Sequence, residues 1–140
     1  MKPLTFKNFI PGIAWFFVVL ILVTLPGEDI PQPKGWFEWI NLIQFDKIVH
    51  IGIFGLLSFL FTRPIARSSS FSPKEKWRYF LKIALAVCIW GLTTELIQKF
   101  YIPTRSFDLV DWAADSIGAL TSLLFSRKVF GKYIKDQEIR

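Results

Sequence analysis

The sequence predicts an all-α integral membrane protein with four transmembrane helices in a compact antiparallel bundle and a short interfacial helix between the first and second spans. Hydrophobic residues make up 52% of the 140 residues, aromatic residues make up 17%, and the mean hydropathy is +0.40. A soluble domain of this size cannot bury so much apolar surface in its own core. We therefore expect the excess to face lipid, with residues 1–140 forming a single domain.

The four spans are predicted over residues 9–25, 46–62, 77–100 and 108–125, where the apolar runs lie. A bilayer core of roughly 30 Å requires about 20 helical residues. The second and fourth runs reach that length only if ionisable residues belong to the helices, namely Asp46, Lys47, His50, Asp108, Asp111 and Asp115. The first run follows basic residues as in a signal peptide, but it ends without a small-x-small cleavage pattern, so we expect a retained helix.

The connections carry their own signals. Trp36, Trp39, Ile40 and Ile43 recur with helical spacing, which predicts a short interfacial helix, and a plain connector is an equally weighted alternative. Before the third span, Ser72 is expected to cap a helix that has Pro73 at its first position and Glu75 in its first turn.

Small residues recur on two spans. Ala114, Gly118 and Ser122 are four apart, and Gly52, Gly55 and Ser58 are three apart. Such rows allow the backbones of membrane helices to approach closely. The one cysteine, Cys88, lies in an apolar run and predicts a packing role, because no second cysteine is present for an intrachain disulfide.

The orientation follows from the positions of lysine and arginine. Two basic residues precede the first span, six lie between the second span and the first turns of the third, and five follow the fourth. Because basic residues favour the cytoplasmic side, both termini are expected there. The net charge of +6 does not indicate nucleic-acid binding, since the basic residues flank apolar runs instead of forming one stripe.

Several ionisable residues are expected at one depth in the outer leaflet. His50 follows Asp46 by four residues, Gln98 follows Glu95 by three, and Asp108, Asp111 and Asp115 share one helical face. The second and fourth helices run inward and the third runs outward, which brings His50, Glu95, Asp111 and Asp115 to a similar level. Arg105, in the turn above, is expected to pair with Asp108, Asp111 or Glu95.

These residues carry a resemblance. The stretch from Asp46 to Leu57, together with Glu95, Gln98, Arg105, Asp111 and Gly118 in order, resembles the two motifs of the VanZ-like family of small multi-pass bacterial membrane proteins. It covers about residues 20–124. Asp115 stands where the family usually has Asn, and Ser122 where a second Gly is common. The resemblance implies a place in the bacterial cytoplasmic membrane and a link to teicoplanin susceptibility, which is associated with the founding member.

The expected site is an outward-facing pocket lined by seven polar residues: Asp46, His50, Glu95, Gln98, Arg105, Asp111 and Asp115. His50 has three interpretations. It is a structural residue bonded to Asp46 or Glu95, a general base, or a metal ligand beside Asp111 and Glu95. Asp108 is expected to cap the fourth span. No resident metal or cofactor is assigned.

Two functions follow. In the first, the pocket binds an envelope component, such as a lipid-linked or peptide-bearing precursor, or shields it from a glycopeptide. In the second, the protein is a membrane-embedded hydrolase or transferase acting on a lipid-linked precursor, with His50, Glu95 and Asp111 as candidate catalytic residues; no known catalytic motif supports it. A channel is disfavoured because the inner halves of the spans are mostly apolar. The oligomeric state is left open.

Overall fold

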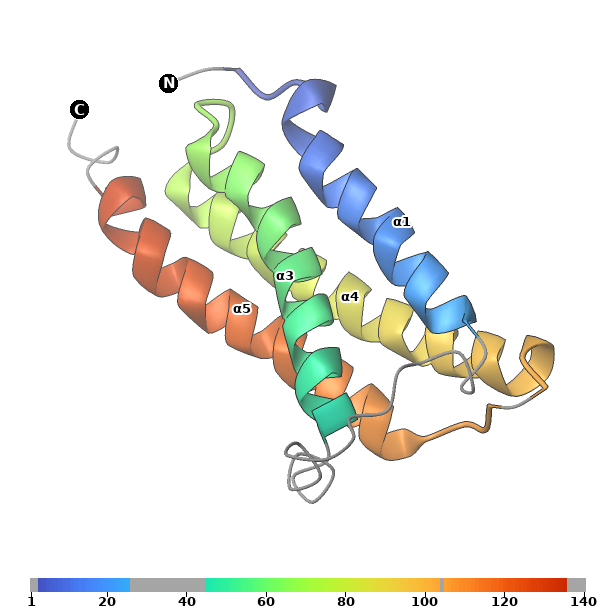
Figure 1. The fold of residues 1–140 in the computed structure, drawn as a ribbon. Coiled ribbons are helices and arrows are strands. Elements are labelled where there is room, and N and C mark those ends of the chain that lie inside the picture. Colours follow the sequence, from blue (N-terminus) through green and yellow to red (C-terminus); the bar gives the residue numbers. More distant parts are fainter. Residues whose placement is uncertain (1–2, 26–44, 104, 136–140) are drawn as a thin grey trace, which may run out of the picture.

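The computed structural model describes residues 3–25, 45–103 and 105–135. A short 3-10 helix, η1 (Phe6–Phe9), leads directly into α1 (Ile10–Thr24), and three longer helices follow: α3 (Phe45–Arg67), α4 (Pro73–Tyr101) and α5 (Leu109–Lys135). Successive helices run in opposite directions, so that α1 starts and α5 ends at the same end of the bundle (Figure 1). The expected all-α architecture is confirmed. The expected interfacial helix at Trp36–Ile43 lies outside the described residues.

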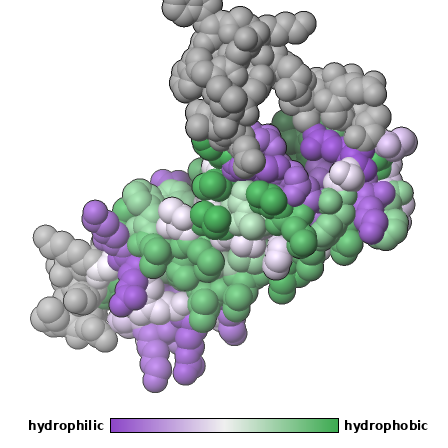
Figure 2. All heavy atoms as spheres, turned by 90° about the horizontal axis from the view of Figure 1, so that it is seen from below, coloured by the Kyte–Doolittle hydropathy of each residue, from purple (hydrophilic) through white to green (hydrophobic). Residues whose placement is uncertain are grey.

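Among the described residues, three helical segments are long and apolar enough to cross a membrane: Phe6–Thr24, Asp46–Arg67 and Pro73–Tyr101. Large apolar side chains on these segments point outward, among them Phe17, Ile21 and Ile89. Figure 2 shows the apolar side chains in the middle of the molecule and hydrophilic ones toward its two ends. This distribution fits a bilayer environment. The helix α5 has 27 residues, and its first half contains Asp111 and Asp115.

The helices extend beyond the expected spans. The helix α3 continues past residue 62, where the second span was expected to end, as far as Arg67 with Pro64 inside it, so Arg63 and Arg67 are helical. Likewise, α5 continues to Lys135, ten residues past the expected end. Hydropathy marks only the apolar part of a helix, whereas backbone hydrogen bonding continues into the polar turns beyond it.

The helix start predicted before the third span is confirmed, including its capping chemistry. The Ser72 backbone N–H donates to the Glu75 carboxylate at 2.8 Å, and the Glu75 N–H donates to the Ser72 hydroxyl at 3.4 Å. Pro73 occupies the first helical position, as expected. This reciprocal pair satisfies backbone donors that a helix start otherwise leaves unpaired.

The most extensive contact in the bundle joins α3 to α5. At its centre, a Cβ built on Gly118 would lie 2.3 Å from the Ile51 carbonyl oxygen, and one built on Gly55 would lie 3.2 Å from the Gly118 carbonyl oxygen. The row on α5 therefore packs as expected, with Ala114 and Ser122 also buried. The row on α3 is only partly right, because Gly52 is exposed and a Cβ there would meet nothing within 4 Å.

The interior of the bundle contains two apolar clusters and, at one end, a group of ionisable residues. An apolar cluster built around Val19, Phe54, Leu57, Val87 and Ala119 joins all four long helices. A second cluster, around Ile65, Phe80 and Phe130, lies toward the end where α3 finishes and α4 begins. The ionisable residues lie at the opposite end, where α3 and α5 begin and α4 finishes.

Candidate functional site

Three helices bring one ionisable side chain each to a common point, which confirms the predicted convergence. His50 on α3 lies with its Nδ1 2.8 Å from Oδ1 of Asp115 on α5, close enough for the imidazole to donate to the carboxylate. Glu95 on α4 completes the group, and one ligand atom from each of the three lies within 4.8 Å of the others. Glu95 and Asp115 are fully buried, and the His50 side chain is 12% exposed. We call these three residues the acid–histidine cluster.

Lys47 is the cation beside this cluster. Its Nζ lies 2.9 Å from the Asp46 carboxylate and 3.1 Å from that of Asp108, and it also contacts Asp111 at hydrogen-bonding range. The sequence placed Lys47 in the second span, but its pairing with three carboxylates was not predicted. The available signal was its position three residues before His50, which places both on one helical face.

Asp111 connects the two groups. Its carboxylate contacts Lys47, and its Oδ2 lies 3.9 Å from Nε2 of His50. The side chain is 12% exposed. His50 therefore lies between two carboxylates of α5, Asp111 on one ring nitrogen and Asp115 on the other. The expected structural partners of His50, Asp46 and Glu95, are not its hydrogen-bonding partners.

Two carboxylate oxygens in the acid–histidine cluster have no hydrogen-bond donor among the described residues. Oε2 of Glu95 accepts the backbone N–H of Asp108 at 2.8 Å, but its Oε1 is buried and unpartnered. Oδ1 of Asp115 faces His50, but its Oδ2 is also buried and unpartnered. Burying an unpaired carboxylate oxygen is costly, so these two oxygens are available to accept hydrogen bonds from a donor or to coordinate a cation.

Gly91 on α4 makes room for Asp115. A Cβ at position 91 would lie 2.9 Å from both the Cβ and Oδ2 of Asp115, closer than real Cβ contacts. Any larger residue would push the carboxylate away from its position. The role of Gly91 was not predicted from the sequence, because a lone glycine in an apolar run does not reveal what lies against it.

Asp108 caps α5, as the sequence predicted. Its Oδ1 accepts the N–H of Val110 at 2.7 Å, and its carbonyl accepts the N–H of Trp112 at 3.2 Å. The Val110 N–H and the Lys47 ammonium stabilise the charged form and hold the pKa of Asp108 below its ordinary value. The carboxylate is thus ionised throughout the neutral range.

Arg105 and Gln98 do not join the acid–histidine cluster. The expected pairing of Arg105 with Asp108, Asp111 or Glu95 is wrong, because Arg105 makes no ion pair within residues 3–25, 45–103 and 105–135, and its Nε is buried without an acceptor there. Lys47 takes that place instead. Gln98 donates to the Val23 carbonyl at 3.2 Å and so ties α4 to the end of α1. Asp46 lies at the rim, with its side chain 61% exposed.

The arrangement suits either of two kinds of ligand. A molecule that presents N–H or O–H donors would satisfy the two unpartnered oxygens. A divalent cation would also be matched, by one imidazole nitrogen and carboxylate oxygens. The possible metal ligands predicted from the sequence were His50, Asp111 and Glu95. In the structure the three residues that come together are His50, Glu95 and Asp115, so Asp115 replaces Asp111 in the set.

The fold and the site define a class: an all-helical protein with membrane-spanning potential and a buried cluster of ionisable residues drawn from three helices. Comparison with protein-family models, with curated proteins and with solved structures finds no match.

Proposed function

We propose that this chain is a VanZ-like protein of the bacterial cytoplasmic membrane, in which the acid–histidine cluster lies in the outer leaflet and binds an envelope component. The ligand class is a lipid-linked, peptide-bearing precursor or a glycopeptide, and binding modulates susceptibility to teicoplanin-type antibiotics. The resemblance of the Asp46–Leu57 and Glu95–Gly118 stretches supports the family, and the geometry of the cluster supports a binding site.

The proposed topology has four spans with both termini in the cytoplasm. The α5 helix serves as the fourth span, since its 27 residues are more than enough to cross a bilayer core. It also buries Asp111 and Asp115 against neighbouring helices instead of exposing them to lipid, which is where ionisable residues are tolerated in membranes. With the basic ends inward, the acid–histidine cluster faces the outside.

The observation that carries the proposal is a pair of buried oxygens, Oε1 of Glu95 and Oδ2 of Asp115, that have no hydrogen-bond partner in the described part of the chain. Stable membrane proteins satisfy polar groups within the bilayer, so leaving two carboxylate oxygens unpaired indicates a site prepared for a ligand. Peptide amides, ammonium groups and sugar hydroxyls are the donors that a peptide-bearing precursor or a glycopeptide provides. Arg105, with its unpartnered Nε, is positioned in sequence just before α5 for a carboxylate or phosphate of the same ligand.

The test is direct binding of a lipid-linked peptide precursor to the purified full chain in nanodiscs. Asp115→Asn and Glu95→Gln keep the shape of each side chain and remove its charge. We expect each variant to weaken binding at least tenfold, since a charge-assisted hydrogen bond is lost. His50→Ala is expected to weaken binding to a similar degree, because it removes the group that orients Asp115.

The matched control is Glu75→Gln, which changes an exposed acid at the other end of the bundle. Glutamine also supports a capping box, so α4 should begin normally. This variant should bind as the unaltered protein does. The contrary result is that Asp115→Asn, Glu95→Gln and His50→Ala bind the precursor as tightly as the unaltered protein and keep its unfolding temperature. That result would show that the acid–histidine cluster does not bind the precursor.

A second function rests on the mutual distances in the cluster. Ligand atoms of His50, Glu95 and Asp115 lie within 4.8 Å of one another, which is a spacing that a small inward shift converts into coordination of one cation. A divalent ion there would polarise a phosphoryl or carbonyl oxygen and activate a water, as in metal-assisted hydrolysis of a lipid-linked precursor. This is the hydrolase or transferase alternative.

A metal census of the purified chain separates the two functions. The enzyme alternative requires about one divalent ion per chain, lost in the variant with both His50→Ala and Asp115→Asn, together with turnover of a labelled precursor. Binding of the precursor without metal and without turnover leaves the first function standing alone.

A further inference from the structure

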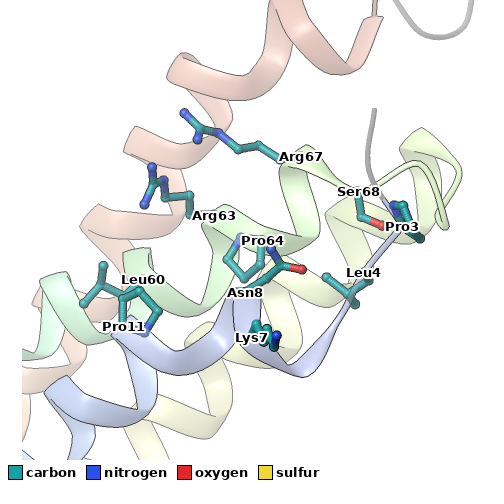
Figure 3. Close-up of a pocket in the computed structure, with 10 residues that line it drawn as sticks. All are labelled: Pro3, Leu4, Lys7, Asn8, Pro11, Leu60, Arg63, Pro64, Arg67 and Ser68. Carbon is teal, nitrogen blue, oxygen red and sulfur yellow. The ribbon is translucent and has the colours of Figure 1, made fainter.

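A second polar site lies at the other end of the bundle, far from the acid–histidine cluster. A pocket of about 500 Å³ opens between the N-terminal segment with η1 and the last turns of α3 (Figure 3). Its volume is within the roughly 300–1,000 Å³ range of small-molecule sites. Arg63 in its wall follows His50 by thirteen residues on α3, or about 20 Å along the helix. Neither proposed function uses this pocket.

Three cations line the pocket. Lys7 comes from η1, and Arg63 and Arg67 come from successive turns of α3. In Figure 3 the two arginine side chains extend from α3 in the same direction. No acidic residue is among those lining the pocket, and none of the three cations forms an ion pair within residues 3–25, 45–103 and 105–135. The positive charge there is uncompensated by the described part of the chain.

The rest of the lining is amphipathic. Asn8 and Ser68 add neutral hydrogen-bonding groups, whereas Leu4, Pro11 and Leu60 add apolar surface. Pro64 also lines the pocket; having no N–H, it leaves the Leu60 carbonyl without its usual helical donor. A pocket lined by both cations and apolar side chains matches a molecule with an anionic head and an apolar body.

We propose that this pocket binds a phosphate group, supplied either by the headgroup of an anionic phospholipid or by a soluble phosphate. Two arginines at positions i and i+4 place two planar guanidinium groups one turn apart. Such groups form bidentate hydrogen bonds with phosphate oxygens, and Lys7 adds a third positive charge from the facing segment. Basic pockets between membrane helices are a recognised means of holding phosphate headgroups.

The experiment compares lipid retention by the full chain in native mass spectrometry and in nanodiscs of defined composition. The probes are phosphatidylglycerol, phosphatidylcholine and inorganic phosphate. The variant with both Arg63→Gln and Arg67→Gln is expected to weaken phosphatidylglycerol binding at least tenfold, with phosphatidylcholine binding unchanged. Both arginines are exposed, so the fold should persist, and Lys7→Gln provides a second variant outside α3.

The matched control removes two exposed charges from α5, with Arg127→Gln and Lys128→Gln together. It should change phosphatidylglycerol binding less than twofold. Competition by millimolar inorganic phosphate would assign the site to a soluble phosphate, and its failure to compete would assign the site to the lipid headgroup. The proposal would be overturned if the two double variants lost phosphatidylglycerol binding to the same degree. It would also be overturned if the unaltered chain bound neither phosphatidylglycerol nor inorganic phosphate.

Discussion

The helices α3 and α5 make a buried polar contact in each half of the bundle, and the two contacts differ in completeness. In one half, the Thr62 and Ser126 hydroxyls lie 3.1 Å apart, and Thr62 also donates to the Phe59 carbonyl. In the other half, Nδ1 of His50 lies 2.8 Å from Oδ1 of Asp115, yet Oδ2 of Asp115 has no partner among the described residues. The hydroxyl pair completes itself within the helices, as structural contacts do. The charged pair is left incomplete in the described part of the chain, and an unpaired carboxylate oxygen costs more to bury than a neutral hydroxyl.

The surroundings reinforce this difference. The hydroxyl pair is neutral and small, so its burial costs little. The charged pair lies beside Glu95, Asp111 and the ion pairs of Lys47. Buried charges are retained at a cost in stability, which argues for a role other than holding two helices together. Four variants would break or sharpen the contrast.

The largest effect is expected from Lys47→Met. The change keeps the length of the side chain but leaves Asp46, Asp108 and Asp111 without their shared cation. Removing one partner of a buried ion pair costs about 3–5 kcal/mol. We expect the free energy of unfolding in detergent to decrease by an amount near the lower end of that range, because Asp46 and Asp108 are partly hydrated. An unfolding temperature equal to that of the unaltered chain would show that the ion pairs do not support the charged half.

Gly118→Ala is expected to disturb both halves at once. The new Cβ would lie 2.3 Å from the Ile51 carbonyl oxygen, so α3 and α5 must separate. Such overpacking costs about 1–3 kcal/mol, and thermal unfolding in detergent measures it. The matched control is Gly52→Ala, where a Cβ meets nothing within 4 Å and the better helix propensity of alanine favours folding. Equal stability of the two variants would contradict the close packing of α5 on α3.

A smaller effect is expected from the combined change Thr62→Val and Ser126→Ala. Both partners of a hydrogen bond are replaced by apolar groups of similar shape, which is nearly neutral for stability. We expect a change in unfolding free energy below about 1 kcal/mol and unaltered precursor binding. A binding loss as large as that of Asp115→Asn would remove the distinction between the two contacts.

The smallest effect is expected from Asp108→Asn, and it depends on pH. The folded-state pKa of Asp108 is lowered, so its ionised form adds stability above the unfolded-state pKa, near 3.8, and that stability is lost as the pH falls through the folded pKa. Asparagine caps helices nearly as well, and the partly exposed ion pair is screened. The unaltered chain should therefore unfold at a slightly higher temperature than the variant at pH 7, and the gap should close toward pH 3. A gap that widens with acidification would contradict the assignment.

Local sequence patterns predicted much of this molecule. Ser72, Pro73 and Glu75 marked a helix start, Asp108 marked another, and the spacing of Asp111 and Asp115 placed both on one face. These inferences succeeded because caps and helical faces depend on residues three or four positions apart. Helix rise and direction also predicted that His50, Glu95 and Asp115 lie at a similar depth, and in the folded chain these three residues are close together.

The tertiary structure alone decided who pairs with whom. In the folded chain Lys47, and not Arg105, pairs with Asp108 and Asp111, which lie 61 and 64 residues further along the sequence. Gln98 donates a hydrogen bond to the Val23 carbonyl, which lies 75 residues earlier. The tertiary structure also set Gly91 against Asp115 and left Gly52 facing open space. These outcomes depend on how each helix is rotated about its axis and packed against its neighbours. The spacing of residues within one helix does not contain that information, because every rotation preserves it.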